Sequence, residues 1–432
     1  MNPNMDRKIL NTCEKVADQA EVTGIQRNYK SVDMNPVRCV FGSGSMYGNG
    51  LRMIRNGRLG AAGQWGPVSH FELVERAIGS CRYGPKALID LPSASSASPA
   101  AKPSTLLKLT HEEAAEYLWG IQSRIRESFP EALLSAELKW GTDNIFLANS
   151  KGLTASHTRY FTGNRLSVTM PSPDGLLQTG CSVDTTMELP DPDALVETLS
   201  LPLTASRLHK GEVVGRKHVV LSPAAFSIML QALRAGVSGR LLARGASPLA
   251  GMEGKKVISD KLTVRDMPCL DTGGSSTPFD SEGIPAFNKI LFKDGEFVDF
   301  IHDLSSAAET GAESTGNSGR NIGEHSRPVC TNIVVDSSSE SSANLLSETG
   351  TGILVTNILS AESGNAASGH FVFDCGRVHL FRHGEIYGYY DGCVLTGNVY
   401  DSLSRVTDVG KLQYRTNDDL LPFVSLEGVS VR

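Results

Sequence analysis

The stretch from Thr349 to Leu403 constrains the fold more than any other, because apolar runs alternate in it with turn residues. Ile353 to Leu359 is a continuous run of β-branched and aliphatic side chains, which is short for a helix and typical of a strand buried on both faces. The polar segment from Ser360 to Gly369 predicts an exposed loop.

Two more apolar runs follow, from His370 to Cys375 and from Val378 to His383. The Gly376-Arg377 pair between them predicts a two-residue hairpin whose first position needs a positive φ. A third strand is expected after Gly384, and the final strand from Leu421 to Val431. The C-terminal part is therefore expected to consist mainly of antiparallel strands.

The N-terminal part combines helix and hairpin signals. Apolar side chains at helical spacing predict an amphipathic helix over residues 6–22, and Tyr29 to Phe41 is expected to form a strand. The glycine-rich segment 42–50 is expected to be a loop. Asn56-Gly57 predicts a hairpin between Leu51 and Ala62.

Two capping boxes, Ser69 to Glu72 and Thr110 to Glu113, predict the starts of two helices, because the hydroxyl and the carboxylate can bind free amides of the first turn. Residues 93–105 between these helices are rich in Ser, Ala and Pro, and too poor in large apolar side chains to fold alone. After the second helix, five short strands are expected between residues 134 and 183, with turns at 149–152, 163–164 and 173–175.

These signals predict an α+β fold, with N-terminal helix-and-antiparallel-sheet domains followed by a β-rich C-terminal domain. We expect an N-terminal α+β domain over residues 1–92, a linker over 93–105, a central α+β domain over 106–210 and a β-rich domain over 211–432. The length of 432 residues suits two or three domains.

Charge and cysteine usage limit the function classes. The formal net charge of −6, without any basic run, argues against nucleic-acid binding, since clustered Lys and Arg bind phosphates. The eight cysteines are scattered without a C-x-x-C pair, which indicates free thiols in a reducing compartment. No run of about 18 apolar residues is present to span a membrane. We expect a cytoplasmic protein that binds neither nucleic acid nor membrane.

Several motifs resemble the TldD/PmbA family, in which PmbA is also called TldE. SAESGNAASGHF, the HGE before the last hairpin strand and TGNVYDSL resemble its C-terminal domain. Residues 270–320 carry an Asp-x-Glu-Gly run at 280–283 and a Gly-Asn-x-x-Arg-like loop at 316–320. GNGLRMIRNGRLGAAG and ANSKGL extend the resemblance over nearly the whole chain. An older description of the family as a modulator of DNA gyrase gains no support from the acidic charge balance.

The resemblance implies that a TldD-type catalytic subunit carries H-E-x-x-x-H on a helix, with two His ligands and a Glu base for zinc hydrolysis. The matching helix here reads PAAFSIMLQALRAG after Ser222 and has no His, Asp or Glu between Pro223 and Gly236. The C-G-x-x-G-Q run of such subunits is also missing, and Cys375-Gly376 lies well before its position. We therefore expect no catalytic residue and no metal ligand here, and zinc on a TldD-type partner.

Histidines elsewhere are expected to be structural. His111-Glu112 resembles half of a zincin motif, but Ala115 and Glu116 stand where a second histidine would follow. His379 and His383 are four residues apart, which suits chelation on a helix but separates them by ~13 Å along a strand.

The residues that the resemblance implies for a peptide cleft are Asp280, Glu282, Asn317 and Arg320. Asp280 and Glu282 lie at i and i+2, on one face of the chain if it is extended there. Such a pair could hold a cation, share a proton or bind a neighbouring arginine, or it could belong to a solvated or salt-bridged turn before Gly283. The glycine-rich loop 310–323 is expected to be mobile unless something binds it, and to contact a peptide backbone or carboxylate or to be an ordinary surface loop.

The resemblance favours a metal-free TldE/PmbA-like subunit that pairs with a TldD-type zinc subunit, forming a peptidase for short or unfolded peptides. The alternative is a stand-alone homodimer that binds peptides or another ligand without catalysis. A third hypothesis, an enzyme that uses Asp280, Glu282 and a histidine, needs ligands that no motif supplies.

Overall fold

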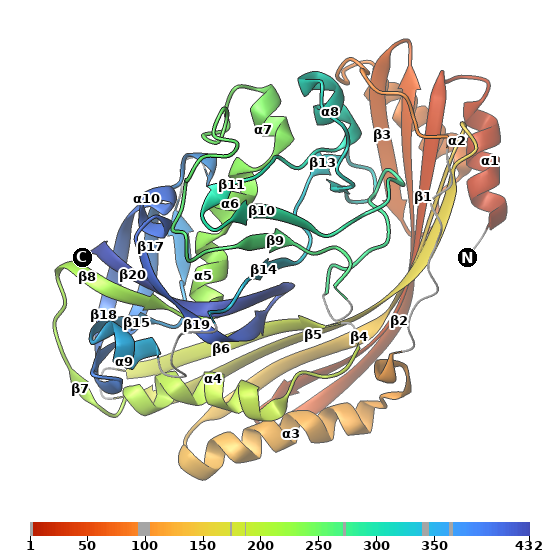
Figure 1. Ribbon diagram of the computed structural model, residues 1–432. Helices are drawn as coiled ribbons and strands as arrows, with labels where there is room; N and C mark the ends of the chain where they lie inside the picture. The colour runs from red at the N-terminus through yellow and green to blue at the C-terminus, as the bar shows by residue number, and fades with distance from the viewer. Residues whose placement is uncertain are drawn as a thin grey trace.

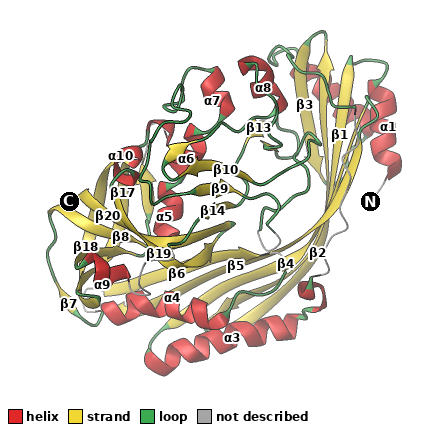
Figure 2. Ribbon diagram, in the orientation of Figure 1, coloured by secondary structure: helices red, strands yellow, loops and turns green. Residues whose placement is uncertain are grey.

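Two β-sheets dominate the computed structural model, which describes residues 3–93, 104–172, 175–185, 187–270, 274–338, 345–362 and 366–432. A long, curved six-stranded sheet has the order β3-β2-β1-β4-β5-β6, and the described residues also form a 12-stranded sheet. The curved sheet bends around the C-terminal part of the chain, which lies on its concave side (Figures 1 and 2). This arrangement confirms the predicted α+β fold.

The curved sheet is built from antiparallel strands. Its convex face is covered at one end by α1 and α2 and at the other by α3 and α4 (Figure 1). The strands are β1 (Gln19–Asn35), β2 (Arg38–Arg55), β3 (Arg58–Trp65), β4 (Leu133–Asn149), β5 (Thr154–Ser172) and β6 (Gly175–Thr185). The helices are α1 (Pro3–Cys13), α2 (His70–Cys81), η1 (Thr105–Lys108), α3 (His111–Ser128) and α4 (Pro192–Ala205).

Strand β1 shows how the two faces divide. Val22 packs in the cluster under α1 and α2, and Val32 packs in the cluster under α3 and α4. Side chains alternate between faces along a strand. Odd-numbered residues of β1 therefore face the concave side, where Thr23 and Ile25 line a cavity.

Local signals predicted several elements correctly. Asn56 and Gly57 have φ of 51° and 68° and join β2 to β3. Thr110 and Glu113 form the reciprocal capping box of α3. At α2, the Ser69 hydroxyl accepts a hydrogen bond from the Glu72 amide.

The predicted loop over residues 42–50 is wrong, because these residues belong to β2. A Cβ on Gly44 would lie 2.7 Å from the Tyr29 hydroxyl, and one on Gly48 would lie 2.9 Å from the Trp65 ring. The glycines therefore make room for aromatic side chains on neighbouring strands. The first helix also ends at Cys13, and residues 19–22 of the predicted helix 6–22 are in β1.

The five short strands predicted between residues 134 and 183 are three long ones. Gly163-Asn164 continues β5. The turn at 149–152 is confirmed, since the Asn149 amide donates to the Leu153 carbonyl and Gly152 has a φ of 92°. The predicted turn residues Pro173 and Asp174 lie outside the described residues, as do 94–103 of the predicted linker.

The C-terminal part contains a second, larger sheet and short helices. Its strands are β7 (His209–Lys210), β8 (Gly215–Leu221), β9 (Val264–Asp266), β10 (Lys289–Lys293), β11 (Glu296–Phe297), β14 (Ile333–Val335), β15 (Thr351–Val355), β16 (Ser360–Glu362), β17 (His370–Arg382), β18 (Glu385–Asn398), β19 (Val406–Thr416) and β20 (Asp419–Val431); β12 (Ser318–Gly319) and β13 (Arg327–Pro328) pair separately. The helices are α5 (Pro223–Met229), α6 (Gln231–Gly236), α7 (Gly239–Ala243), α8 (Leu304–Thr310), α9 (Leu345–Thr349), α10 (Val399–Leu403) and η2 (Ala366–Ser368).

The predicted hairpin at Gly376-Arg377 is a β-bulge inside one continuous strand, β17. Gly376 has a φ of 57°, so the positive φ was expected correctly but its structural role was not. The hairpin lies later, at His383 and Gly384, with φ of 50° and 89°. The strand predicted over 353–359 ends at Val355, and the loop predicted over 360–369 contains β16.

The β19–β20 turn docks against the edge of β6 and joins the two sheets. The Asp184 amide donates to the Asn417 carbonyl over 3.2 Å, and the Asn417 amide donates to the Ser182 carbonyl over 3.0 Å. Burial and then the charge of Asp418 raise the pKa of Asp184 to about 6. Strands from residues 1–92 and 106–210 share one sheet; the division into domains stays a prediction.

Candidate functional site

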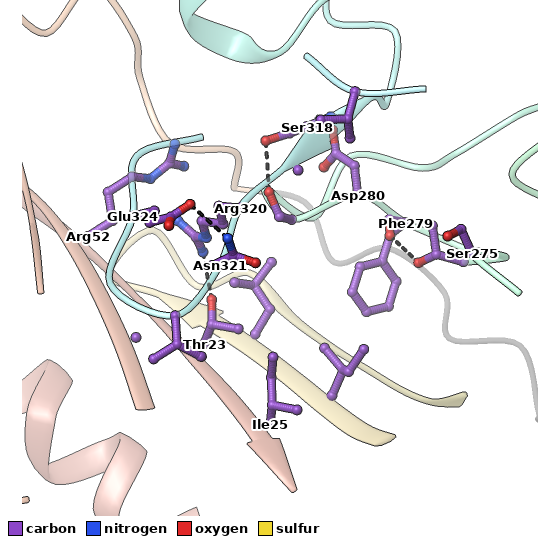
Figure 3. A pocket seen from close by; sticks show the side chains of 18 of the residues that line it. Thr23, Ile25, Arg52, Ser275, Phe279, Asp280, Ser318, Arg320, Asn321 and Glu324 are labelled. Atoms are coloured by element: carbon purple, nitrogen blue, oxygen red, sulfur yellow. Dashed lines mark hydrogen bonds between the residues drawn. The ribbon is translucent and has the colours of Figure 1, made fainter. Parts of the chain in front are cut away.

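A cavity of about 250 Å³ lies between the concave face of the curved sheet and the segment 275–331. Figure 3 shows Thr23 and Ile25 on the sheet side and Ser275, Phe279, Asp280 and Ser318 on the opposite side. Sheet residues that line the cavity are Thr23, Ile25, Gly50, Leu51, Arg52, Ile145, Leu147, His157 and Arg159. The cavity therefore joins residues that are far apart in the sequence.

The floor of the cavity is a row of side chains across three strands. Ile25 pairs with Ile145, and Ile145 pairs with His157. The His157 ring meets the Phe279 ring edge-on, with centroids 4.9 Å apart. Burial, and then the charge of Arg159, lower the pKa of His157 to about 4, so the imidazole is neutral at pH 7.

One wall of the cavity is held by a buried cluster of two arginines and two glutamates. Arg52 forms ion pairs with Glu282 and with Glu21, the latter at 3.2 Å. Arg320 binds Glu21 at 2.6 Å and donates to the Thr23 hydroxyl over 2.6 Å. Two positive and two negative charges balance, which the desolvation of buried ions requires.

Close backbone approach completes this wall. A Cβ on Gly63 would lie 2.4 Å from the Gly323 nitrogen, and a Cβ on Gly50 would lie 3.6 Å from the same atom. Glycine at position 63 thus lets residues 322–323 lie directly on β2 and β3.

The structure brings two of the four predicted cleft residues to the cavity. Asp280 and Arg320 line it. Glu282 is fully buried, where it accepts hydrogen bonds from the Ser326 hydroxyl and the Leu304 amide. Asn317 is also buried, and donates to Asp266 over 2.6 Å. A peptide-cleft role for these four residues stays a prediction.

The segment 280–283 is a salt-bridged turn before Gly283, one of the two interpretations that the sequence allowed. Asp280 accepts hydrogen bonds from the amides of Glu282, Ile284 and Ser318, and Gly283 has a φ of 79°. Burial and then the Glu282 charge raise the pKa of Asp280 to about 7. Burial opposes ionisation of Glu282, but Arg52 and the hydrogen bonds from Leu304 and Ser326 together outweigh it and lower that pKa.

Buried polar contacts hold part of the glycine-rich loop 310–323, whereas its expected mobility stays a prediction. Asn317 is 1% exposed, and the Ser318 amide binds Asp280. The Arg320 side chain is 7% exposed. The partners of these groups are distant in sequence, so an interpretation of short sequence windows could not identify them.

Sequence reasoning also missed Arg27, Asp143 and Arg159, which lie in one row beside the cavity floor. Asp143 is 1% exposed. It accepts two hydrogen bonds from Arg27, over 2.7 and 2.8 Å, and one from Arg159 over 2.7 Å. Burial opposes its ionisation, but the two arginines lower its pKa. Strand alternation could have placed Arg27 on the face of Ile25, had β1 been predicted at full length.

The described residues do not fit a zinc ion at the helix that the family resemblance implies. On α5, Ser227 donates to Asp419 over 2.8 Å, and on α6 Arg234 forms an ion pair with Asp419. Across the described part of the chain, no group of three or more His, Cys, Asp or Glu side chains is placed to hold a metal ion. Cys375 is buried in β17, and His379 is buried beside Thr356.

The cysteines and the lengths of the helices bear on two expectations from the sequence. All eight cysteines lie among the described residues, and all are free thiols. The helices that the structure describes include none that is long and apolar enough to cross a membrane.

The fold is that of the PmbA/TldD group of proteins. Residues 214–432 match the family of the PmbA/TldA metallopeptidase C-terminal domain, and the chain belongs to this family. The structure of TldE from Thermococcus kodakarensis superposes with a TM-score of 0.87 at 22% identity, over 98% of this chain and 99% of that chain. At this identity the likeness shows the fold.

Curated relatives match a smaller part of the chain. The metalloprotease PmbA of Escherichia coli O157:H7 is 29% identical over 201 residues, which is 44% of this chain and 41% of that protein. A metalloprotease of Methanothermobacter thermautotrophicus is 27% identical over 199 residues, or 45% and 43%. The chain thus matches about two fifths of the length of these relatives.

Proposed function

We propose that this chain is a TldE/PmbA-like subunit without a zinc site, which pairs with a TldD-type zinc subunit in the cytoplasm. The pair forms a peptidase for short or unfolded peptides. This chain supplies walls of the peptide cleft, with Asp280, Glu282, Asn317 and Arg320 holding its shape.

The observation that carries the proposal is the chemistry of α5 and α6. The polar side chains Ser227 and Arg234 both bind Asp419, so these two groups make internal contacts. A guanidinium cannot ligate zinc, because it has donors and no acceptor. In the proposed pair, the ligands that hold a zinc-bound water come from the TldD-type chain.

The cavity supports the peptide part of the proposal. It has apolar side chains on its floor and polar groups at its rim, as ligand sites commonly do. It lies on the concave face of the curved sheet, where strand backbones run beside it.

The test combines assembly, metal content and cleavage. This chain and a TldD-type chain from the same genome are purified separately and together, without chelator, and are measured by light scattering, plasma mass spectrometry and cleavage of an unstructured fluorogenic peptide. We expect a heterodimer that cleaves the peptide, with less than about a tenth of a zinc bound to this chain alone. The control pair carries a TldD-type chain whose zinc-binding histidines are replaced by alanine.

Stoichiometric zinc on this chain alone, or cleavage by it alone, would overturn the proposal. A stable homodimer that ignores the TldD-type chain would favour the stand-alone binding protein.

A further inference from the structure

We infer that the concave face beside the cavity holds a carboxylate-binding subsite, in which Arg159, supported by Arg27 and Asp143, binds a carboxylate of an extended peptide. The inference rests on the proposed function, because it names the chemical group of the peptide that this chain recognises. It concerns a row of residues that neither the motifs nor the family resemblance identified.

The register of the sheet places this row next to the cavity floor. Arg27 pairs with Asp143, and Asp143 pairs with Arg159. Each of these residues lies two positions from a member of the floor row, so all three share the concave face. Arg159 itself lines the cavity together with His157.

The row itself carries a net positive charge. Asp143 is buried, and its two oxygens are shared between Arg27 and Arg159. Because both arginines lower the pKa of Asp143, the carboxylate stays ionised and the row sums to one positive charge. The neighbouring cluster of Arg52, Arg320, Glu21 and Glu282 sums to zero. Asp280 also lines the cavity, but burial and Glu282 raise its pKa to about 7, so its carboxyl is only partly ionised at neutral pH and offsets the charge of the row in part.

Arg159 has donors to spare. Among the described residues it forms a hydrogen bond only with Asp143, through Nη2, whereas a guanidinium carries five N–H donors. Its side chain is 29% exposed. Arg27, by contrast, uses Nε and Nη2 on Asp143 and lies over the Phe161 ring, 5.0 Å from its centroid. Arg159 is therefore the residue placed to bind, and Arg27 holds Asp143 in position.

A second polar group beside Arg159 also lacks a partner. Neither ring nitrogen of His157 has a hydrogen-bond partner within the described ranges, although both atoms are buried. A buried donor without a partner destabilises a protein, so an acceptor on a ligand would bind favourably at this position. The neutral imidazole supplies one N–H without adding charge.

The surroundings favour a carboxylate over a phosphate. The cavity floor is apolar at Ile25 and Ile145, and Phe279 forms a wall. One net positive charge matches a monoanion, and arginine binds a carboxylate through two parallel hydrogen bonds. A volume of about 250 Å³ is below the usual range for small-molecule sites, so a chain end or one acidic side chain fits better than a larger ligand.

The experiment measures peptide binding to the full chain by calorimetry at low salt. The probes are acetyl-Ala-Ala-Ala with a free carboxylate, the same peptide as its C-terminal amide, and acetyl-Ala-Glu-Ala-amide. We expect at least one carboxylate peptide to bind about tenfold more tightly than the neutral amide. The two acidic probes show whether the carboxylate comes from the chain end or from a side chain.

Variants locate the site. Arg159→Gln removes the free guanidinium but leaves Asp143 paired with Arg27, so the protein should still fold. We expect this variant to bind the carboxylate and amide peptides with about equal affinity. Arg159→Lys keeps the charge without the planar fork, and should keep part of the preference. The matched control is Arg124→Gln on α3, where Arg124 pairs with Asp193 away from the cavity, and it should keep the full preference.

Equal binding of acid and amide peptides would overturn the inference, as would an unchanged preference in Arg159→Gln. These results are independent of the proposed function, because pairing and cleavage are measured with the TldD-type chain. A pair that cleaves peptides without any carboxylate preference would overturn the inference alone. A chain with the preference but no partner would overturn only the proposed function.

Discussion

Arg52 on β2 forms a buried ion pair with Glu282, 230 positions further along the chain. Arg52 also pairs with Glu21, whereas Glu282 has no other cationic partner among the described residues. Loss of Arg52 therefore leaves Glu282 without a cation, whereas loss of Glu282 leaves Arg52 paired with Glu21. The two substitutions should lower the free energy of unfolding by different amounts.

Arg52→Met leaves Glu282 buried without a cation, and we expect it to lower the free energy of unfolding by about 3–5 kcal/mol. Glu282→Gln keeps Arg52 paired with Glu21, so its cost should be clearly smaller. Urea unfolding of both variants and of the double variant measures the coupling. Equal single effects that add in the double variant would contradict this account of the pair.

Gly63→Ala should destabilise the protein by about 1–3 kcal/mol, because the new methyl group would overlap the backbone at Gly323. The matched control is Gly120→Ala in α3, where a Cβ meets nothing within 4 Å. That variant should stabilise the protein by up to about 1 kcal/mol, since alanine is the better helix former. Thermal unfolding separates the two; a neutral Gly63→Ala would argue against close docking of residues 322–323.

Stability should fall as the pH drops from 6.5 towards 4. Burial is the main cause that lowers the pKa of both His157 and His379 from 6.5 to about 4, so the folded chain keeps both neutral while the unfolded chain takes up protons. Each neutral histidine's contribution to the free energy of unfolding, on the order of 3 kcal/mol, is therefore fully present above pH 6.5 and is lost as the pH falls towards 4. Thermal midpoints measured across this range should show a shallower slope in His379→Gln, and an unchanged slope would contradict the assignment.

Asp184 should act in the opposite direction at the junction of the two sheets. Its pKa is raised from 3.8 to about 6 by burial and by Asp418, so its destabilising effect grows as the pH rises through this range. The free energy of unfolding of Asp184→Asn should equal that of the parent protein near pH 4 and exceed it at pH 7 by on the order of 1 kcal/mol. The difference is small because partial exposure screens the charges. A variant that is less stable at pH 7 would show that the carboxylate stabilises the junction.

The sequence predicted those elements whose signals are local. Asn56-Gly57 and the Thr110–Glu113 box act through neighbouring backbone atoms, so a short window contains the whole cause. The glycines of 42–50 misled the same reasoning, because their role is to accept Tyr29 and Trp65 from neighbouring strands. Gly376 was recognised as a positive-φ position, but only the pairing of β17 with β18 decides between a hairpin and a bulge.

The candidate site was predicted only in part for the same reason. Asp280 and Arg320 were selected through family motifs, and both line the cavity. His157 and Phe279 are more than a hundred positions apart in the sequence, yet their rings are in contact. The role proposed for Arg159 depends on its ion pair with Asp143 on the neighbouring strand. Neither relationship produces a motif.

The ion pairs between the curved sheet and the segment 282–326 also bear on whether the C-terminal part of the chain can fold alone. The part that carries the family's sequence signature begins at residue 214, yet Glu282 and Arg320 find their charged partners at Arg52 and Glu21. A fragment cut at that boundary would keep two charges and lose the counterions that allow their burial. Residues 214–432 should therefore fold stably only together with the curved sheet that supplies Arg52 and Glu21.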